Sequence, residues 1–425
     1  MFNFRKMFVM GSFGFASGLP YILIFSTLTA WLRDVDISLS TIGFFAWISL
    51  TYSLKFLWAP FVDRFSIPFL AKYGKRKSWI IIAQLIIVLS LLALSSIDPK
   101  NNISLFILFA FFIAFSGSIQ DIAIDAFRIE YAEIEDQGNL AAAYQFGYRL
   151  AILVATSLAL ILADNYGWSK TYEVMALLML FGFIGVLISK KEIVNNDLEK
   201  LNFIDSFIEP IRDFGTRYGF YLASILLLIV ATYRLTDIVM GPMANPFYLD
   251  MGYTLTQIGS VVKIVALIAS IVGIFIGGIL IKRVGLYYSL LTGAFLVMLT
   301  NLCFSYVAIT NEVFFQFGLV NIPLKLSTIV GLDSIAAGVV GTVNITFLTS
   351  LVSKKYTAVQ YALLTSFMML PGKIFSGFSG VMASYFQSFS SLEFGWMYFY
   401  IATSLLTIPS IAFIMINKNF FIKHE

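Results

Sequence analysis

The sequence predicts an all-α integral membrane protein with about twelve transmembrane helices in two six-helix halves. Three observations support this fold class. Of the 425 residues, 59% are hydrophobic and 12% are charged, against a charged fraction of roughly 25% in soluble domains. The apolar residues form long runs, and a membrane-spanning helix needs about 20 mostly apolar residues. A short motif also recurs after about half the chain.

The apolar runs place the expected helices along the whole chain. No small-residue cleavage site follows the first run, so we expect it to remain as a helix. The expected spans are approximately 7–32, 41–62, 78–97, 103–126, 140–163, 171–189, 218–240, 255–281, 287–309, 328–352, 359–384 and 395–416.

Lys and Arg residues are unequally distributed between alternate connections. With a cytoplasmic N-terminus, 19 of the 28 lie in cytoplasmic segments and five within spans. The other four are Arg33, Lys100, Lys170 and Lys325. Cytoplasmic connections of membrane proteins carry the excess of basic residues, so we expect both termini in the cytoplasm. Because these residues do not gather on one exposed face, we expect no nucleic-acid partner.

A repeat relates the two halves. Leu39–Gly43 reads LSTIG at the start of the second expected helix, and Leu255–Gly259 reads LTQIG at the start of the eighth, 216 residues later. Glycines and basic residues follow both helices, at Gly74–Lys77 and Lys282–Gly285. Two parallel six-helix halves are typical of the major facilitator fold, whose substrate site lies between the halves near the midplane.

The domain organisation follows from this repeat. We expect an N-terminal half at 1–189, a cytoplasmic linker at 190–217, a C-terminal half at 218–416 and a cytoplasmic tail at 417–425. A linker of about 28 residues is too short for an ATPase domain, which needs upwards of about 50. The phosphate-binding Gly-rich loop with a following Lys-Ser/Thr is also absent from the sequence. Uphill movement would therefore draw on an ion gradient, and we expect neither an enzyme nor a cofactor.

Two carboxylates end the fourth expected helix. Its sequence QDIAID places Asp121 and Asp125 four residues apart, on one helical face. In a partly dehydrated cleft, neighbouring carboxylates disfavour double ionisation, so this pair is a candidate for proton coupling. The alternatives are that Asp125 caps the helix end near Arg128 and that Asp121 only pairs with a neighbouring helix.

Arg149 lies in the fifth helix at a depth that Asp121 could match, and we expect an ion pair between them. The pair could exchange partners with an anionic substrate or simply hold two helices together. Gln145 and Tyr148 can hydrogen-bond a sugar or a peptide and are further candidate substrate residues.

Other ionisable residues lie within the spans, where each costs roughly 2.5–3.5 kcal/mol and therefore needs a cavity or a partner. Arg234 and Asp237 are three residues apart and can neutralise each other. The spans contain five basic residues and four carboxylates, so the net charge of the interior is positive and should favour an anion. Three single cations, Lys55, Lys263 and Lys373, are therefore candidate substrate-binding residues, and Asp333 is a possible partner for them.

The cytoplasmic turn after the second helix carries Asp63 and Arg64, followed by the basic cluster Lys75–Lys77. Asp63 and Arg64 are gate candidates, and anchoring of the topology is the alternative. The glycines at positions 11, 14 and 18 allow either a hinge or close packing of the first helix. The single cysteine, Cys303, and the single histidine, His424, exclude an internal disulfide and a Cys-based zinc site, and we expect no metal.

Several stretches resemble the AmpG-type muropeptide permeases of the major facilitator superfamily. They are GFASGLP with LTAWL (14–32), TIGFF and KFLWAPFVDR (41–64), GKRKSW (74–79), QDIAIDAFR (120–128), GYRLA (147–151) and YTAVQYALLTS (356–366). The resemblance covers essentially the whole chain.

The resemblance implies proton-driven import of N-acetylglucosaminyl-anhydro-N-acetylmuramyl peptides from periplasm to cytoplasm, for cell-wall recycling. We accordingly expect a monomer in a bacterial inner membrane, with an anionic glycopeptide and protons as its partners. By matching motifs, the family's functional residues carry over to Asp121, Asp125, Arg149, Asp63 and Arg64. Gln360 and Tyr361 match the QYALL stretch and are further candidate cavity residues.

The second half departs from the family pattern, because Thr328–Leu351 keep only a loose match and the loop around Pro323 is divergent. Transport of another bulky anion, such as a coenzyme A ester, is therefore an alternative. A membrane-embedded enzyme would need clustered catalytic carboxylates or a metal site on a sizeable loop. A solute receptor would need an attached soluble domain. The sequence favours neither.

Overall fold

The computed structural model describes residues 4–131, 137–189, 205–317, 320–353 and 357–423. These residues form helices and one two-stranded hairpin. Within this part of the chain, nine helical segments are long and apolar enough to cross a membrane. The expected all-α integral membrane class is thus confirmed.

The number of spans remains a prediction. The expected eighth and ninth helices form one apolar segment, Leu255–Ile309, which bends at Gly285 with a φ of 79°. The expected second helix is not among the nine because it is divided into short helical pieces. The expected eleventh helix is likewise interrupted between Ser376 and Ser379.

The chain divides into two compact units. Unit 1 comprises Met1–Leu198 and Gly252–Ser260, and unit 2 comprises Glu199–Met251 and Val261–Glu425. The expected linker lies partly outside the described residues, at 190–204, and its remainder begins a helix at Asp205. The expected domain boundaries themselves stay predictions.

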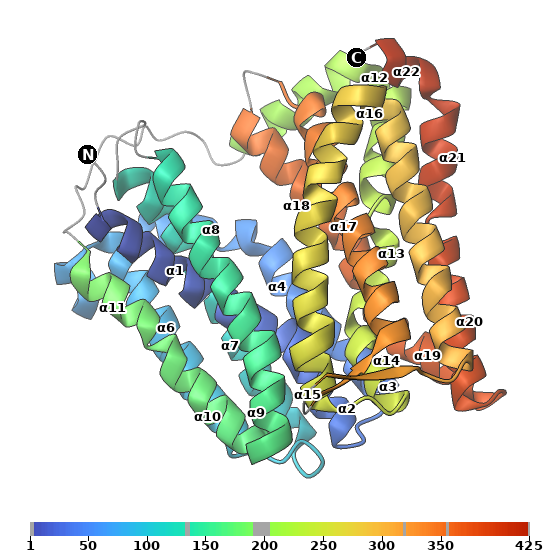
Figure 1. Cartoon of the computed structure of the whole chain (residues 1–425). Helices are drawn as coiled ribbons and strands as arrows, with labels where there is room; N and C mark the ends of the chain where they lie inside the picture. The colour runs from blue at the N-terminus through green and yellow to red at the C-terminus, as the bar shows by residue number, and fades with distance from the viewer. Residues whose placement is uncertain (1–3, 132–136, 190–204, 318–319, 354–356, 424–425) are drawn as a thin grey trace. The chain divides into compact units, whose positions relative to one another are not determined.

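Unit 1 consists of helices joined by turns and short loops in its described residues (Figure 1). Its elements are α1 (Phe4–Ile22), η1 (Leu23–Thr27), α2 (Leu28–Asp34), α3 (Leu39–Phe45), η2 (Ala46–Ser49), α4 (Leu50–Ser53), η3 (Lys55–Leu57), α5 (Ala59–Arg64), η4 (Pro68–Tyr73), α6 (Lys75–Ser95), α7 (Ile103–Tyr131), α8 (Gln137–Leu153), η6 (Val154–Leu158), α9 (Ala159–Tyr166), α10 (Trp168–Met179), α11 (Phe181–Ile188) and α15 (Leu255–Gln257).

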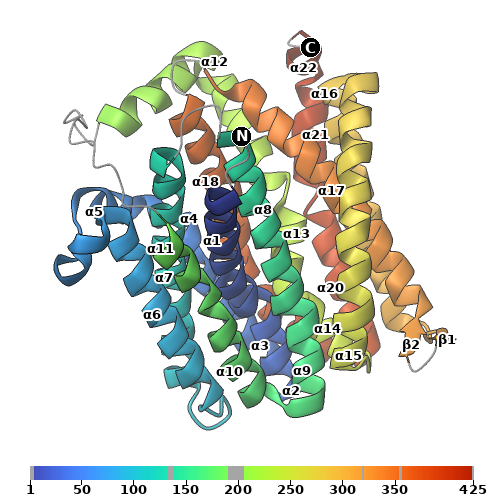
Figure 2. The same ribbon diagram turned by 60° about the vertical axis from the view of Figure 1, so that its left-hand side comes forward.

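The first described helix of unit 2 starts within the expected linker, and the other elements of the unit follow it (Figure 2). Its elements are α12 (Asp205–Thr232), α13 (Leu235–Met240), η7 (Gly241–Met243), α14 (Ala244–Asp250), α16 (Lys263–Ile309), β1 (Phe314–Phe317), β2 (Val320–Pro323), α17 (Leu324–Leu351), α18 (Thr357–Ser376), α19 (Ser379–Ser388), α20 (Leu392–Leu405), α21 (Ile408–Ile416) and α22 (Lys418–Lys423). The short π-helical η8 (Ile258–Val262) joins α15 to α16.

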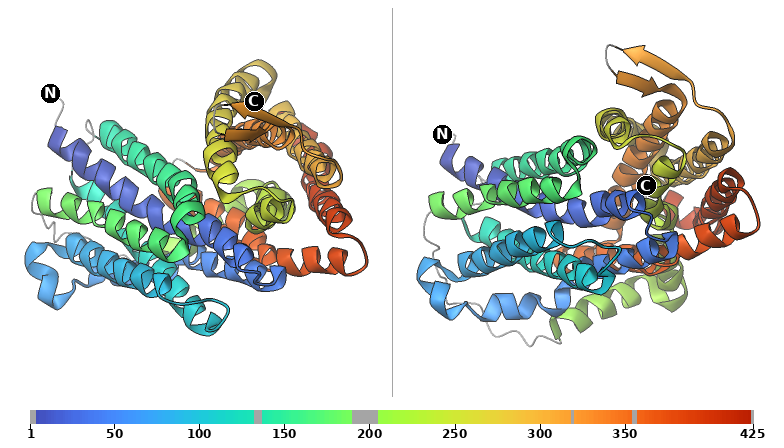
Figure 3. Two further views of the ribbon diagram at one scale, coloured as in Figure 1. Left: turned by 60° about the horizontal axis from the view of Figure 1, so that its bottom comes forward. Right: turned by 90° about the horizontal axis from the view of Figure 1, so that it is seen from below.

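The hairpin of β1 and β2 connects α16 to α17. Its strands are antiparallel, with Phe314 opposite Pro323 and Phe315 opposite Ile322. Both phenylalanines are about half exposed, at 52% each. Figure 3 shows the two strands as arrows at one end of unit 2. The sequence did not predict these strands, because their short apolar run differs little from the helical runs beside it.

Glycines bring α1 and α8 into close contact. A Cβ atom added at Gly147 would lie 1.8 Å from the carbonyl oxygen of Gly11, and one added at Gly14 would lie 1.9 Å from that of Tyr144. One at Gly18 would lie 3.0 Å from the Cβ of Ala151. Small residues at such a crossing let two backbones approach closely within a membrane. These contacts support close packing, rather than a hinge, as the role of the glycines in the first helix.

Glycines also allow α16 and α17 to pack closely in unit 2. A Cβ atom at Gly273 would lie 2.1 Å from the carbonyl oxygen of Ile335, and one at Gly338 would lie 2.4 Å from that of Ser270. Around this crossing lies a core of fully buried side chains that includes Leu226, Leu290 and Phe347. Each unit is therefore held by its own close helix crossing.

Candidate functional site

Asp121, on α7, lies among polar side chains inside unit 1. Its Oδ1 atom is buried and has no hydrogen-bond partner among the described residues. Ser17 and Tyr52 lie nearby, both with buried hydroxyl groups, and each interacts with the Asp121 carboxyl. Gln120, the preceding residue, is anchored because its Nε2 donates to the carbonyl of Ala16 at 2.8 Å. A buried carboxyl oxygen without a hydrogen-bond partner is unusual and marks a candidate functional group.

Lys55 is the basic residue that stabilises the ionised carboxyl group of Asp121. It begins η3, in a stretch where the second expected helix loses its α-helical geometry at Leu54 and again at Trp58. The ammonium group of Lys55 interacts electrostatically with the Asp121 carboxyl, although the described residues show no ion pair between them. The helix interruption therefore places a cation opposite a buried acid.

Asp125 has a different environment from Asp121. Its Oδ1 lies 3.7 Å from Nη2 of Arg128, one turn further along α7, and its side chain is 49% exposed. This contact agrees with the alternative considered from the sequence, in which Asp125 lies at the helix end near Arg128. The two carboxylates share a helix face and interact electrostatically, but only Asp121 has a shielded oxygen without a partner.

Three tyrosines lie around Asp121, and a fourth, Tyr21, packs against one of them. The rings of Tyr21 and Tyr52 meet edge to face at 4.9 Å, and those of Tyr144 and Tyr148 lie 6.4 Å apart on successive turns of α8. Tyr52, Tyr144 and Tyr148 each interact electrostatically with Asp121. Of these, only Tyr148 was predicted from the sequence. Tyr144 could have been predicted as well, because it lies four residues before Tyr148 and therefore on the same face of the helix. Nothing in the sequence indicated Tyr21 or Tyr52.

The expected ion pair between Arg149 and Asp121 is wrong: no such contact exists among the described residues. Tyr144 and Tyr148 occupy the face of α8 nearest Asp121, and Arg149 is rotated by about 100° from Tyr148. Arg149 and Gln145 are both exposed and lie one turn apart. Together they present a guanidinium and an amide on the surface of unit 1.

Unit 2 contains a second set of buried charged groups. Nη2 of Arg234 lies 3.5 Å from Oδ2 of Asp237, as their spacing indicated, and Arg234 stands at the interruption between α12 and α13. The hydroxyl of Thr300 donates to Oδ1 of Asp333 at 2.8 Å. Asp333 also interacts electrostatically with Asp237. The second half is thus richer in buried polar contacts than its scattered charges suggested.

The lysines of unit 2 are not paired with Asp333 in the described residues. Lys263 instead donates to Oδ1 of Asn245 at 2.9 Å and lies 5.9 Å from the ring centroid of Tyr248. Lys373, on α18, is buried, with 6% of its surface exposed. Asn245 and Tyr248 are polar neighbours that sequence reasoning missed, because neither carries a charge.

Gln360 and Tyr361 lie in packed surroundings. The amide nitrogen of Gln360 donates to the Pro210 carbonyl and to Asp213 at 2.9 and 2.8 Å. Its oxygen accepts from Arg217 at 3.0 Å and from the Ser353 amide at 2.7 Å. All hydrogen-bonding positions of this amide are thus occupied by protein groups. Tyr361 packs against the core of unit 2.

The gate candidates Asp63 and Arg64 end α5, and their side chains lie outside the described residues. The turn that follows them is firmly attached to α6. Nη1 of Arg76 donates to the carbonyl of Val62 at 3.2 Å, and the indole of Trp79 donates to that of Phe65 at 2.7 Å. Arg76 of the basic cluster therefore has a structural role, as does Lys77, whose Nζ donates to the carbonyl of Ser189.

Interrupted helices with polar and charged residues at the interruptions are the usual means by which helical membrane transporters bind solutes. Solved structures of such transporters share the fold of this chain. The nucleoside transporter NupG superposes with a TM-score of 0.72 at 12% identity, covering 98% of this chain and all of that one. A bacterial homologue of the human lysosomal transporter Spinster gives 0.71 at 13% identity, covering 100% and 99%. These similarities define the fold class of the chain: it has the major facilitator fold.

The Major Facilitator Superfamily model matches residues 7–376. "Putative transporter AmpG 4" of Rickettsia conorii is 32% identical over 421 residues, 98% of this chain and 97% of the relative. The "Anhydromuropeptide permease" of Escherichia coli K12 is 30% identical over 408 residues, covering 96% and 78%. The chain belongs to the Major Facilitator Superfamily and, within it, to the AmpG-type permeases, which confirms the resemblance seen in its motifs.

Proposed function

We propose that this protein imports anhydromuropeptides together with protons across a bacterial inner membrane. The observation that carries the substrate assignment is the full-length similarity to a relative named anhydromuropeptide permease. The basic residues of the expected spans agree with such a substrate, because the peptide and the muramyl group both carry carboxylates. Lys55 and Arg149 in unit 1, and Lys263 and Lys373 in unit 2, are the cations that would attract them.

Arg149 and Gln145 suit recognition of the glycopeptide on unit 1. A guanidinium group can bind a carboxylate through two parallel hydrogen bonds. An amide one helical turn away can both donate to and accept from sugar hydroxyls or peptide groups. Both side chains are exposed, so binding would not require them to leave a protein partner in the described contacts.

Asp121 is the residue we propose for proton coupling. When ionised, its carboxylate is stabilised by Lys55, with which it interacts electrostatically. A substrate carboxylate that binds Lys55 would weaken this stabilisation, and Asp121 would then favour its protonated form. By linkage, protonation of Asp121 must in turn favour anion binding at Lys55. Because Lys55 interacts with either Asp121 or the substrate carboxylate, it couples binding of the proton to binding of the muropeptide.

Inward transport with both termini in the cytoplasm completes the proposal. In unit 1, the helix ends near the N-terminus carry Arg5, Lys6, Lys72 and Lys75, while Asp34 lies at the opposite end of the first span. This polarity agrees with the positive-inside rule. Lys75→Cys and Lys100→Cys, each in a Cys303→Ser background, would be treated in intact cells with a membrane-impermeant maleimide. Labelling only at position 100 is expected, and labelling only at position 75 would reverse the orientation.

Uptake into right-side-out vesicles tests the function itself. Labelled anhydromuropeptide should accumulate in an energised vesicle and fail to do so with a protonophore. Asp121→Asn should abolish accumulation but retain counterflow exchange, which requires no net proton movement. Asp36→Asn, at an exposed pair with Lys100, is the matched control and should behave as wild type. Uptake insensitive to both protonophore and Asp121→Asn would refute coupling, and an unlabelled coenzyme A ester that competes better than muropeptide would refute the substrate.

A further inference from the structure

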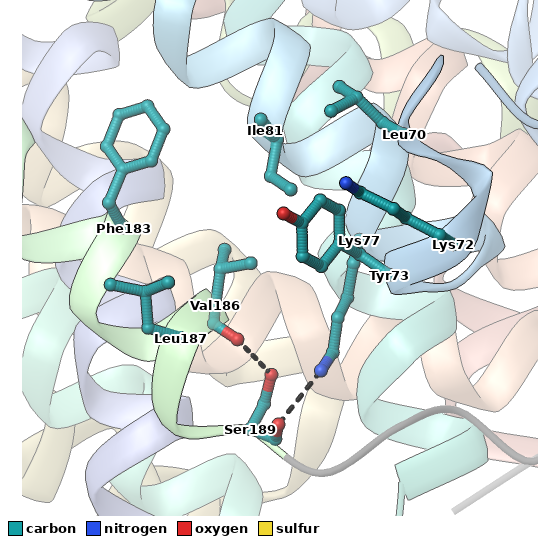
Figure 4. Close-up of a pocket in the computed structure, with 9 residues that line it drawn as sticks. All are labelled: Leu70, Lys72, Tyr73, Lys77, Ile81, Phe183, Val186, Leu187 and Ser189. Atoms are coloured by element: carbon teal, nitrogen blue, oxygen red, sulfur yellow. Dashed lines mark hydrogen bonds between the residues drawn. The ribbon is translucent and has the colours of Figure 1, made fainter. Parts of the chain in front are cut away.

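A cavity of about 540 Å³ opens inside unit 1 where η4 and the first turns of α6 meet the end of α11. One side is polar, with Lys72, Tyr73 and Lys77 (Figure 4). The other side is apolar, with Phe183 and Leu187 among its residues. The proposed transport mechanism uses none of these groups.

The floor of the cavity is a fixed polar structure. Nζ of Lys77, a side chain with only 5% of its surface exposed, donates to the carbonyl of Ser189 at 2.9 Å. The hydroxyl of Ser189 donates to the carbonyl of Val186 at 2.7 Å, and Figure 4 shows both bonds. A buried ammonium group thus stands beneath the opening and contributes positive charge without being displaced.

The rim carries a second cation and a hydroxyl. Nζ of Lys72 lies 5.1 Å from the centroid of the Tyr73 ring, and both side chains are exposed. Figure 4 shows the Tyr73 hydroxyl directed into the cavity. An ammonium and a phenolic hydroxyl, side by side, can both donate to the oxygens of one phosphate group.

The surrounding charge is one-sided. Besides Lys72 and Lys77, the described residues at this end include Arg5, whose Nε donates to the carbonyl of Ile188 at 2.8 Å. None of the residues lining the cavity is acidic. Cations in a cavity whose described lining contains no acid attract an anion, particularly beside a low-dielectric wall.

The apolar wall indicates that the anion is amphiphilic. Leu187 is 81% exposed, and Phe69 on the adjacent η4 is 91% exposed. Large apolar side chains so exposed at the end of a membrane span contact lipid rather than water. A small inorganic anion would satisfy the cations and leave this wall unused.

We propose that this cavity binds an anionic phospholipid, with the headgroup phosphate on Lys72 and Tyr73 and the first part of an acyl chain along Phe183 and Leu187. Basic pockets between transmembrane helices are suited to such headgroups. A volume of about 540 Å³ accommodates a headgroup and the start of a chain, while the rest of the lipid stays in the bilayer. On the orientation proposed above, the lipid belongs to the cytoplasmic leaflet.

Native mass spectrometry of the purified full-length protein would test this site. The protein in detergent would be mixed with equal amounts of phosphatidylglycerol and phosphatidylcholine, and the lipid retained would be counted. Phosphatidylglycerol should be retained preferentially. Lys72→Ala should reduce its binding constant about fivefold, the effect of one surface cation on an anionic lipid. Leu187→Gln should reduce retention of phosphatidylglycerol as well.

Lys75→Ala is the matched control, because it removes the same charge at the same end without changing the cavity lining. It should leave retention within twofold of wild type, and an unchanged melting temperature would show that each variant is folded. Equal retention of the two lipids, or an equal loss in Lys75→Ala, would overturn the proposal. Displacement of the lipid by millimolar inorganic phosphate would instead identify a site for free phosphate, which also contradicts it.

Discussion

Arg128 lies 3.7 Å from Asp125, one turn further along α7, and thereby separates the roles of two carboxylates that share one helix face. Asp125 has a cation beside it and is half exposed. Asp121, one turn earlier, has a buried oxygen without a hydrogen-bond partner in the described residues. The arrangement favours Asp121 for reversible proton binding and Asp125 for an electrostatic contact at the helix end.

The first prediction concerns this division of roles. Asp125→Asn should reduce proton-driven accumulation of labelled muropeptide by less than about fivefold, because exposed ion pairs contribute roughly 0.2–1 kcal/mol. Arg128→Gln, which breaks the same pair from the other side, should give a similar small effect. Loss of accumulation with intact counterflow in Asp125→Asn would assign the coupling proton to Asp125 instead.

The second prediction concerns Lys55. Lys55→Met should raise the KM for muropeptide by about tenfold to a hundredfold, since hydrogen bonds to charged groups contribute roughly 1.5–3 kcal/mol. Without this cation the ionised form of Asp121 loses stabilisation and the proton is held more tightly, so half-maximal uptake should move to higher pH. Initial rates across a pH series would measure both effects. Lys100→Met, at an exposed pair, is the control, and a Lys55→Met profile identical to wild type would refute the shared-cation mechanism.

The third prediction contrasts two glutamines. Gln145→Ala should raise KM several-fold without lowering the melting temperature, because its side chain is exposed. Gln360→Leu should lower the melting temperature and leave KM unchanged. The substitution removes all four hydrogen bonds of this amide and leaves the carbonyl of the buried Pro210 without its donor, at a cost of about 1–3 kcal/mol. Thermal unfolding in detergent and uptake kinetics would be measured on both variants. A pure KM effect in Gln360→Leu would return this residue to the substrate site.

The fourth prediction tests the crossing of α1 and α8. Gly147→Ala introduces a Cβ atom 1.8 Å from the Gly11 carbonyl oxygen, so the helices must separate and unit 1 should lose about 1–3 kcal/mol of stability. Gly278→Ala, on α16, is the control because no atom lies within 4 Å of its added Cβ. A lower melting temperature is expected for Gly147→Ala alone, and equal behaviour of the two variants would show that the crossing tolerates separation.

Local spacing predicted local contacts well. Residues three or four apart on a helix necessarily share a face. The Arg234–Asp237 pair, the Asp125–Arg128 alternative and the shared face of Asp121 and Asp125 could therefore be inferred from their positions in the sequence. The fold class was equally accessible, because membrane insertion imposes a composition on the whole chain.

Contacts between helices were harder to predict, for physical reasons. Depth in the membrane can be estimated by counting residues, but rotation about the helix axis cannot, and this caused the error on Arg149. Lys55 was recognised only as a single cation, because the interruption that places it opposite Asp121 leaves no charge signature. Neutral neighbours such as Ser17 and Tyr52 gave no signal, since hydroxyl-bearing residues are common throughout membrane helices.

The backbone contact between α1 and α8 also limits where this protein can bend. The main chains of Gly11 and Gly147 are in direct contact, so no side chain there can rearrange when the angle between α1 and α8 changes. The two helices should therefore move together as one rigid pair. Whatever motion carries the solute across the membrane must therefore take place elsewhere. A short covalent crosslink between α1 and α8 beside this contact should therefore leave the transport rate unchanged.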